Sequence, residues 1–119
     1  MSIKPTILIA DDEEGIRESL RLILEADYSL LFATNGEEAV TSAKAKNPEL
    51  VILDIKMPKM SGLEVLKQIK SANPSAKVII LTGYQCVDIA QEAVKNGALE
   101  YLVKPFKREE IQKAVKKHI

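Results

Sequence analysis

Carboxylates are grouped at two places in this sequence. Four acids in a row, Asp11 to Glu14, directly follow one short apolar run, and Asp54 ends another. Acids at such positions commonly cap the next helix and offset its dipole, and we expect this role of Glu13 and Glu14. For Asp11 and Asp12 a second role is favoured, because neighbouring strands would bring both side chains close to Asp54.

Three converging carboxylates would repel one another unless a cation lay among them. Two unit charges about 4 Å apart repel by on the order of 4 kcal/mol at the effective dielectric of a protein surface. Oxygen ligands without a nearby histidine or cysteine favour a hard ion that retains some water, namely Mg²⁺, or Mn²⁺ in its place. The sequence therefore predicts a metal site at Asp11, Asp12 and Asp54.

Two further apolar runs end in polar residues, Thr82-Gly83 and Lys104. A threonine at a strand end and a lysine at a sheet edge are ordinary when taken singly. Together with Asp54 they supply a nucleophile, a cation and a hydroxyl donor, which are the groups that phosphoryl transfer requires. Gly83 also offers a backbone that a ligand can approach without meeting a side chain.

The elements that carry these residues alternate regularly. Short apolar runs rich in branched residues, which predict buried strands, recur five times: Thr6–Ala10, Ser29–Thr34, Leu50–Asp54, Lys77–Thr82 and Glu100–Val103. Segments of helical period separate them. This alternation of strands and helices predicts right-handed crossovers, which build a doubly wound α/β domain with a parallel sheet and helices on both faces.

The helical segments differ in the strength of their apolar stripes. The clear stripes are Ile16, Leu20, Ile23 and Leu24; Leu63, Leu66 and Ile69; and Ile111, Ala114, Val115 and Ile119. The weaker ones are Ala39, Val40 and Ala43, and Ile89, Ala93 and Val94. Ligands of open α/β sheets bind outside the carboxyl ends of the strands, where the polar residues described above are expected.

Composition bounds the remaining choices. The 119 residues, 46% of them apolar, predict one domain over residues 1–119. Seventeen basic residues balance seventeen acidic ones, so the charge indicates neither direct nucleic-acid binding nor a membrane surface. No membrane span or signal peptide is evident, which predicts a cytoplasmic protein. Cys86 stands alone, which excludes an internal disulfide, and His118 is expected in solvent.

These residues closely resemble the response-regulator receiver domains of two-component signal transduction. The resemblance is carried by the paired acids, Asp54–Pro58 with Ser61–Leu63, Leu81–Gly83, and Gly97-Ala98 leading to Tyr101–Phe106. It covers nearly the whole chain. The resemblance implies a flavodoxin-like sheet of five parallel strands in the order 2-1-3-4-5.

The resemblance also implies a role for each metal-site residue. Asp54 would be the phosphoacceptor. Asp12, Asp54 and the backbone carbonyl of Lys56 would bind Mg²⁺ directly, and Asp11 would act mainly through a water.

A second set would hold the phosphoryl group and report its presence. Thr82, Gly83 and Lys104 would contact the phosphoryl oxygens, and the Lys104-Pro105 bond would be cis. Tyr101 would be the aromatic switch residue, turning inward when Thr82 moves toward the phosphoryl group.

The resemblance implies a switch that catalyses its own modification, rather than a turnover enzyme. Its partner would be a histidine kinase or phosphotransfer protein. The fourth helix, fifth strand and fifth helix would form the output surface, for an output domain or partner. That surface carries both signs of charge, which suits a homodimer as well as a heterologous partner: Asp88, Gln91, Glu92, Lys95, Lys107, Arg108 and Lys113.

Three alternatives share parts of this pattern. A flavodoxin-like cofactor binder needs a hydroxyl- and glycine-rich loop after the first strand, where the acids at 11–14 would repel a phosphate. Aspartyl-nucleophile phosphatases resemble the site, but they place a second aspartate where this chain has Lys56. A receiver fold used as an unphosphorylated interaction module usually lacks one of the site residues, and none is missing here.

Overall fold

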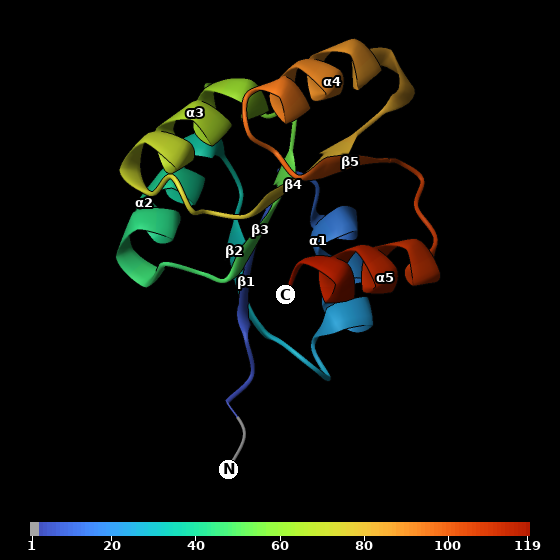
Figure 1. Cartoon of the computed structure of the whole chain (residues 1–119). Helices are drawn as coiled ribbons and strands as arrows, with labels where there is room; N and C mark the ends of the chain where they lie inside the picture. The colour runs from blue at the N-terminus through green and yellow to red at the C-terminus, as the bar shows by residue number, and fades with distance from the viewer. Residues whose placement is uncertain (1–2) are drawn as a thin grey trace.

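A parallel sheet of five strands forms the centre of the molecule (Figure 1). The computed structural model describes residues 3–119, apart from the side chain of Tyr84. The strands are β1 (Thr6–Ala10), β2 (Ser29–Ala33), β3 (Leu50–Asp54), β4 (Val78–Thr82) and β5 (Glu100–Val103). They lie in the order β2-β1-β3-β4-β5, which confirms the expected topology.

Five α-helices cover the two faces of this sheet. They are α1 (Glu14–Leu24), α2 (Gly36–Lys46), α3 (Gly62–Ala72), α4 (Val87–Lys95) and α5 (Arg108–His118), with a 3-10 turn, η1 (Tyr84–Cys86), before α4. Helices α2, α3 and α4 lie on one face, and α1 and α5 on the other (Figure 1). Within residues 3–119, no helix has both the length and the apolar character that crossing a membrane would need.

The core consists of two apolar layers, one on each face of the sheet. Alternate residues of a strand point to opposite faces, so Leu8 packs toward α2, α3 and α4 while Ile7 and Ile9 pack toward α1 and α5. Every residue of β3 and β4 is buried because both faces of these central strands are covered.

The strand register brings the ends of the strands to one level. Ala10 is paired with Leu53, and Thr82 with Val103. The residues that follow β1 and β5, together with the last residues of β3 and β4, therefore meet at the carboxyl edge of the sheet.

The start of α3 is packed directly against the backbone that carries Asp54. A Cβ atom on Gly62 would lie 2.5 Å from the Ile55 Cα atom and 2.6 Å from the Asp54 carbonyl oxygen, so a side chain there would displace the strand end. The Gly62 N–H donates to the Ile55 carbonyl at 2.8 Å, and the Ser61 hydroxyl caps the helix by accepting from Glu64 N–H. This contact fixes the loop after β3.

Two expected strands extend one residue too far. Thr34 lies beyond β2 because its N–H and hydroxyl both donate to the Glu38 carboxylate, at 2.7 and 2.6 Å. Lys77 precedes β4, and its ammonium donates to the carbonyl of His118 at 2.9 Å. In both cases a polar side-chain interaction takes place at the strand boundary.

The apolar stripe expected for α4 is confirmed at Ala93 and wrong at Ile89 and Val94. Ile89 and Val94 are exposed, whereas Ala90 and Ala93 are fully buried against the sheet. Small residues let α4 approach β4 and β5 closely, and the larger side chains then lie at the rim.

The end of α5 also differs from the expectation. Ile119 lies past the helix and is 41% exposed, so it does not complete the apolar stripe. His118 is not a solvated tail residue: its ring contacts the Glu100 carboxylate, and its side chain is only 16% exposed.

Candidate functional site

Two carboxylates and one ammonium group converge at the carboxyl edge of the sheet. The Lys104 Nζ atom lies 2.9 Å from Asp11 Oδ2 and 3.5 Å from Asp54 Oδ2. Asp11 is fully buried, Asp54 is 4% exposed, and the Lys104 side chain is 15% exposed. The parallel register thus unites residues from β1, β3 and β5 that are far apart in the sequence.

More negative than positive charge is present at this point. Asp11, Asp12, Glu13 and Asp54 each offer one carboxylate oxygen, and these four atoms lie within 4.8 Å of one another. Lys104 is the cation that is paired with them. A set of oxygen ligands with excess negative charge fits a hard divalent cation such as Mg²⁺. The cluster therefore has the chemistry that the sequence predicted for a metal site.

Burial raises the pKa of both inner carboxyls. The pKa of Asp54 rises to about 6, first because of its burial and then because of the charge of Asp11, against the opposing effect of Lys104 and of the Lys56 N–H. Burial also raises the pKa of Asp11, although the Glu13 N–H and Lys104 both stabilise its charged form. The cluster is therefore short of positive charge in the absence of a cation.

The pKa of Lys104 is raised, although its burial acts in the opposite direction. Burial by itself would lower the pKa of Lys104, but the hydrogen bond to Asp11 and the charges of Asp11, Asp54 and Glu13 raise it above the ordinary value. Lys104 therefore remains an ammonium group at neutral pH.

An open cavity of about 510 Å³ lies over Asp54. Polar or charged side chains line it together with four other residues: Asp12, Glu13, Asp54, Lys56, Gln85 and Lys104, with Met57, Pro58, Gly83 and Cys86. The Lys56 N–H donates to Asp54 Oδ1 at 3.2 Å and so orients the carboxylate, while the Lys56 side chain is exposed. A small anionic group could reach Asp54 through this cavity.

Thr82 lies beside the site, but its hydroxyl is bonded elsewhere. Thr82 is fully buried, and its Oγ1 donates to the Gly83 carbonyl at 3.0 Å. The Lys104 N–H donates to the Thr82 carbonyl at 2.7 Å, and the Lys104-Pro105 bond is cis, as the resemblance implies.

Tyr101 is near Thr82 along the face covered by α4. Tyr101 of β5 is paired with Ile80 of β4, and it packs in part against the core on the face covered by α4. Ile80 and Thr82 are alternate residues of β4, so they point to the same face of the sheet. Diagonal neighbours on adjacent strands are within reach of an aromatic side chain. The two residues therefore lie on the same face of neighbouring strands.

Glu13 is a site residue that the sequence reasoning assigned to helix capping. Glu13 occupies the N-cap of α1, yet its side chain makes no capping hydrogen bond. Its Oε1 atom instead lies 3.4 Å from Lys104 Nζ. No local signal could reveal this contact, because 91 residues separate the two partners in the sequence.

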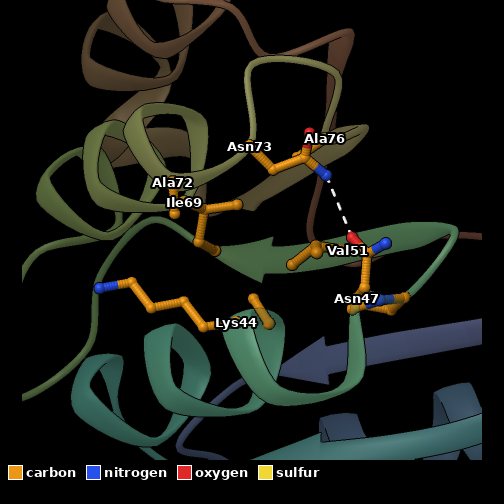
Figure 2. Close-up of a pocket in the computed structure, with 9 residues that line it drawn as sticks. Lys44, Asn47, Val51, Ile69, Ala72, Asn73 and Ala76 are labelled. Carbon is orange, nitrogen blue, oxygen red and sulfur yellow. Dashed lines mark hydrogen bonds between the residues drawn. The ribbon is translucent and has the colours of Figure 1, made fainter.

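A second cavity, of about 430 Å³, lies between α2 and α3 at the opposite end of β3 (Figure 2). Val51 and Ile69 contribute apolar surface to it, and the amides of Asn73 and Asn47 bond across it at 3.1 Å. Lys44 is the one charged residue among those described residues that line it. This cavity lacks the carboxylates of the first.

Comparison with known proteins identifies the family. The family model of the response regulator receiver domain matches residues 7–116. Sporulation initiation phosphotransferase F of Bacillus subtilis is 41% identical over 114 residues, which cover 95% of this chain and 92% of that protein. Chemotaxis protein CheY of Thermotoga maritima is 37% identical, with 93% of this chain and 94% of that protein covered.

Longer proteins match over one part only. Transcriptional regulatory protein ZraR of Klebsiella oxytoca is 42% identical over 89% of this chain, which spans only 24% of that protein. The crystal structure of a response regulator receiver domain protein from Clostridium thermocellum has a TM-score of 0.92 and 37% identity, covering 97% of this chain and 94% of that chain. The chain therefore belongs to the response-regulator receiver domains, the phosphoryl-accepting signalling domains of two-component systems.

Proposed function

We propose that Asp54 is the phosphoacceptor of this receiver domain. A carboxylate oxygen of Asp54 attacks the phosphorus of a phosphohistidine on a histidine kinase or phosphotransfer protein. A P–O bond forms, the P–N bond breaks, and the imidazole leaves with the electron pair. The observation that carries this assignment is the position of Asp54, which ends a central strand at the base of the cavity, 3.5 Å from the Lys104 ammonium.

The acidic cluster would hold Mg²⁺, with Mn²⁺ as a substitute. When bound, the cation neutralises charge that develops on the phosphoryl oxygens. Asp12, Asp54 and the Lys56 carbonyl are the direct ligands in this proposal, and Asp11 acts through a water. The convergence of four carboxylate oxygens within 4.8 Å supports it.

Lys104, Thr82 and Gly83 would hold the phosphoryl group. Lys104 already lies beside Asp54, so its ammonium can pair with an added phosphoryl oxygen after a small movement. The Thr82 hydroxyl must leave the Gly83 carbonyl in order to donate to the phosphoryl group. Gly83 lines the cavity without a side chain, which leaves its backbone accessible.

The domain would catalyse both the gain and the loss of the phosphoryl group. Each proposed catalytic group, namely Asp54, Lys104 and Thr82, belongs to this chain, so a small phosphodonor can replace the kinase. For the loss, water attacks the phosphorus, the bond to the Asp54 oxygen breaks, and phosphate and the carboxylate are released.

The signal would travel through Thr82 and Tyr101 to the surface formed by α4, β5 and α5. Inward movement of Thr82 vacates space that the half-buried Tyr101 ring can fill. Many charged and polar residues of this surface are exposed, which supports contact with a partner or with a second copy of the chain: Asp88, Gln91, Glu92, Lys95, Lys107, Arg108 and Lys113.

Amide NMR with beryllofluoride, a phosphoryl mimic, tests the site and the route together. With Mg²⁺, we expect shifts around Asp54 and along α4 and β5 in the parent, and a loss of the distal shifts in Tyr101→Ala. Shifts confined to the Asp54 pocket of the parent would exclude the route through Tyr101. No Mg²⁺-dependent shift at all would exclude the site.

A further inference from the structure

Lys104 has more anionic partners than the proposed function uses. Its ammonium lies 2.9 Å from Asp11, 3.5 Å from Asp54 and 3.4 Å from Glu13. Glu13 is the exposed one of the three, with a side chain that is 62% accessible. The role inferred below for this third contact rests on the proposed function of Asp54 and Lys104.

The three contacts have different fates when a phosphoryl group arrives. Asp54 carries the group, so the lysine stays near it. Asp11 would contact the cation through a water in the proposed function. The Glu13 carboxylate has no other partner among the interactions found in residues 3–119, and it remains an anion that attracts Lys104 away from the phosphoryl oxygens.

We propose that Glu13 is a positioning residue that retains the Lys104 ammonium in the unphosphorylated arrangement. By holding Lys104, Glu13 weakens the binding of a phosphoryl group at Asp54 and so favours the resting state. The energetic basis is competition between two acceptors for one cation, together with repulsion between the Glu13 carboxylate and the phosphoryl oxygens across the shared cavity.

The local geometry distinguishes this role from helix capping. The Glu13 N–H donates to Asp11 Oδ1 at 2.9 Å, which places the residue over the site, and its carboxylate makes no capping bond to α1. Glu14 is a matched control because it is the next residue, is exposed and has the same charge. Among the ion pairs of the structure that involve Lys104, none includes Glu14.

Removal of the Glu13 charge should affect the cation and the phosphoryl mimic in opposite directions. Mg²⁺ loses a nearby negative charge and should bind slightly more weakly. Beryllofluoride gains an unopposed Lys104 and should bind more tightly. A general loss of site structure would instead weaken both, so the opposite signs are diagnostic.

The experiment compares Glu13→Gln with Glu14→Gln and the parent by calorimetric titration, first with Mg²⁺ and then with beryllofluoride at saturating Mg²⁺. For Glu13→Gln we expect beryllofluoride affinity to rise about two- to fivefold and Mg²⁺ affinity to fall less than about threefold, the range of a solvent-exposed ion pair. Glu14→Gln should match the parent in both titrations. The ¹⁵N NMR signal of the Lys104 ammonium without ligand should shift in Glu13→Gln and should not shift in Glu14→Gln.

A third variant separates contact from charge. Glu13→Asp keeps the charge but is one methylene shorter, so it should release Lys104 and reproduce the altered ammonium signal. Beryllofluoride affinity in Glu13→Gln equal to that of Glu14→Gln would overturn the inference while leaving the proposed function intact. A loss of Mg²⁺ affinity above about tenfold with weaker mimic binding would also overturn it, because Glu13 would then be a metal ligand. If the parent does not bind beryllofluoride with Mg²⁺, the proposed function itself fails and the inference with it.

Discussion

The two ends of β3 carry cavities of similar size and very different chemistry. The cavity at the carboxyl end measures about 510 Å³ and contains Asp54 and Lys104, whereas the one at the amino end measures about 430 Å³ and has a neutral amide pair. Size therefore does not distinguish a functional site in this molecule. The distinguishing property is buried charge that the protein itself leaves incompletely compensated.

The amino end satisfies its own polar groups. Asn73 donates to Asn47 at 3.1 Å, and this bond connects the ends of α2 and α3 (Figure 2). Asn73 also accepts from the Ser75 N–H at 3.1 Å. At the carboxyl end, several carboxylates share one ammonium. The carboxyl end therefore carries an excess of negative charge, and the amino end does not.

Substitution of the site lysine should produce the largest difference between the two ends. Lys104→Met leaves Asp11 and Asp54 without their cation, and we expect it to lower the free energy of unfolding by about 3 to 4 kcal/mol at neutral pH without metal. Lys44→Met, at the other cavity, should change it by less than about 0.5 kcal/mol. Urea unfolding followed by circular dichroism in EDTA measures both. Equal losses would remove the electrostatic distinction between the cavities.

The pH dependence of stability should identify Asp54 as a strained carboxyl. Its pKa is raised from 3.8 to about 6 in the native state, so the native state binds the proton more tightly than the unfolded chain. The stability from this group is present below pH 3.8 and is lost as the pH rises through about 6.

Asp54→Asn should remove this loss. The difference in free energy of unfolding between Asp54→Asn and the parent, both in EDTA, should grow in favour of the variant as the pH rises through that window. The increase should be on the order of 3 kcal/mol. Unfolding curves of the two proteins at several pH values provide the test. A pH-independent difference would show that Asp54 titrates normally.

Magnesium should stabilise the parent by relieving the same repulsion. At a concentration about 100 times the dissociation constant, binding adds about 2.7 kcal/mol and raises the melting temperature. Asp12→Ala should abolish this response and should itself stabilise the metal-free protein, since it removes one of the repelling charges. Scanning calorimetry with and without Mg²⁺ decides it. A melting temperature of the parent that does not change with Mg²⁺ would contradict the metal site.

Removal of the amide bond at the amino end should have the smallest effect. Asn73→Ala loses its hydrogen bond to Asn47, and we expect a loss of about 1 kcal/mol in the free energy of unfolding. Its stabilisation by Mg²⁺ should equal that of the parent, because the two cavities lie at opposite ends of β3. A reduced Mg²⁺ response in this variant would show that the ends are coupled.

The sequence predicted the fold well because the fold depends on regular features. Short apolar runs rich in branched residues define the strands to within one residue, and right-handed crossovers restrict their connection. The same regularity predicted that Asp11, Asp54 and Lys104 would meet, because each follows or ends a parallel strand. The role of each residue in the proposed chemistry stays a prediction.

Contacts that depend on particular side-chain reach were not predictable. Glu13 extends toward Lys104 instead of capping α1, and His118 contacts Glu100 instead of solvent. In α4, the expected stripe was right for Ala93 but wrong for Ile89 and Val94, because Ala90 and Ala93 fill the space against the sheet. Periodicity reports which face is apolar, but the distance between helix and sheet decides which residues are buried.

Mapping of the phosphorylated residue tests the central claim most directly. The parent and Asp54→Ala are incubated with acetyl phosphate and Mg²⁺, and intact and peptide mass spectrometry then measures the incorporated phosphoryl groups. We expect one group on Asp54 of the parent, none when Mg²⁺ is withheld, and none in Asp54→Ala. Labelling of Asp54→Ala to the same extent as the parent would contradict the assignment of Asp54 as the phosphoacceptor.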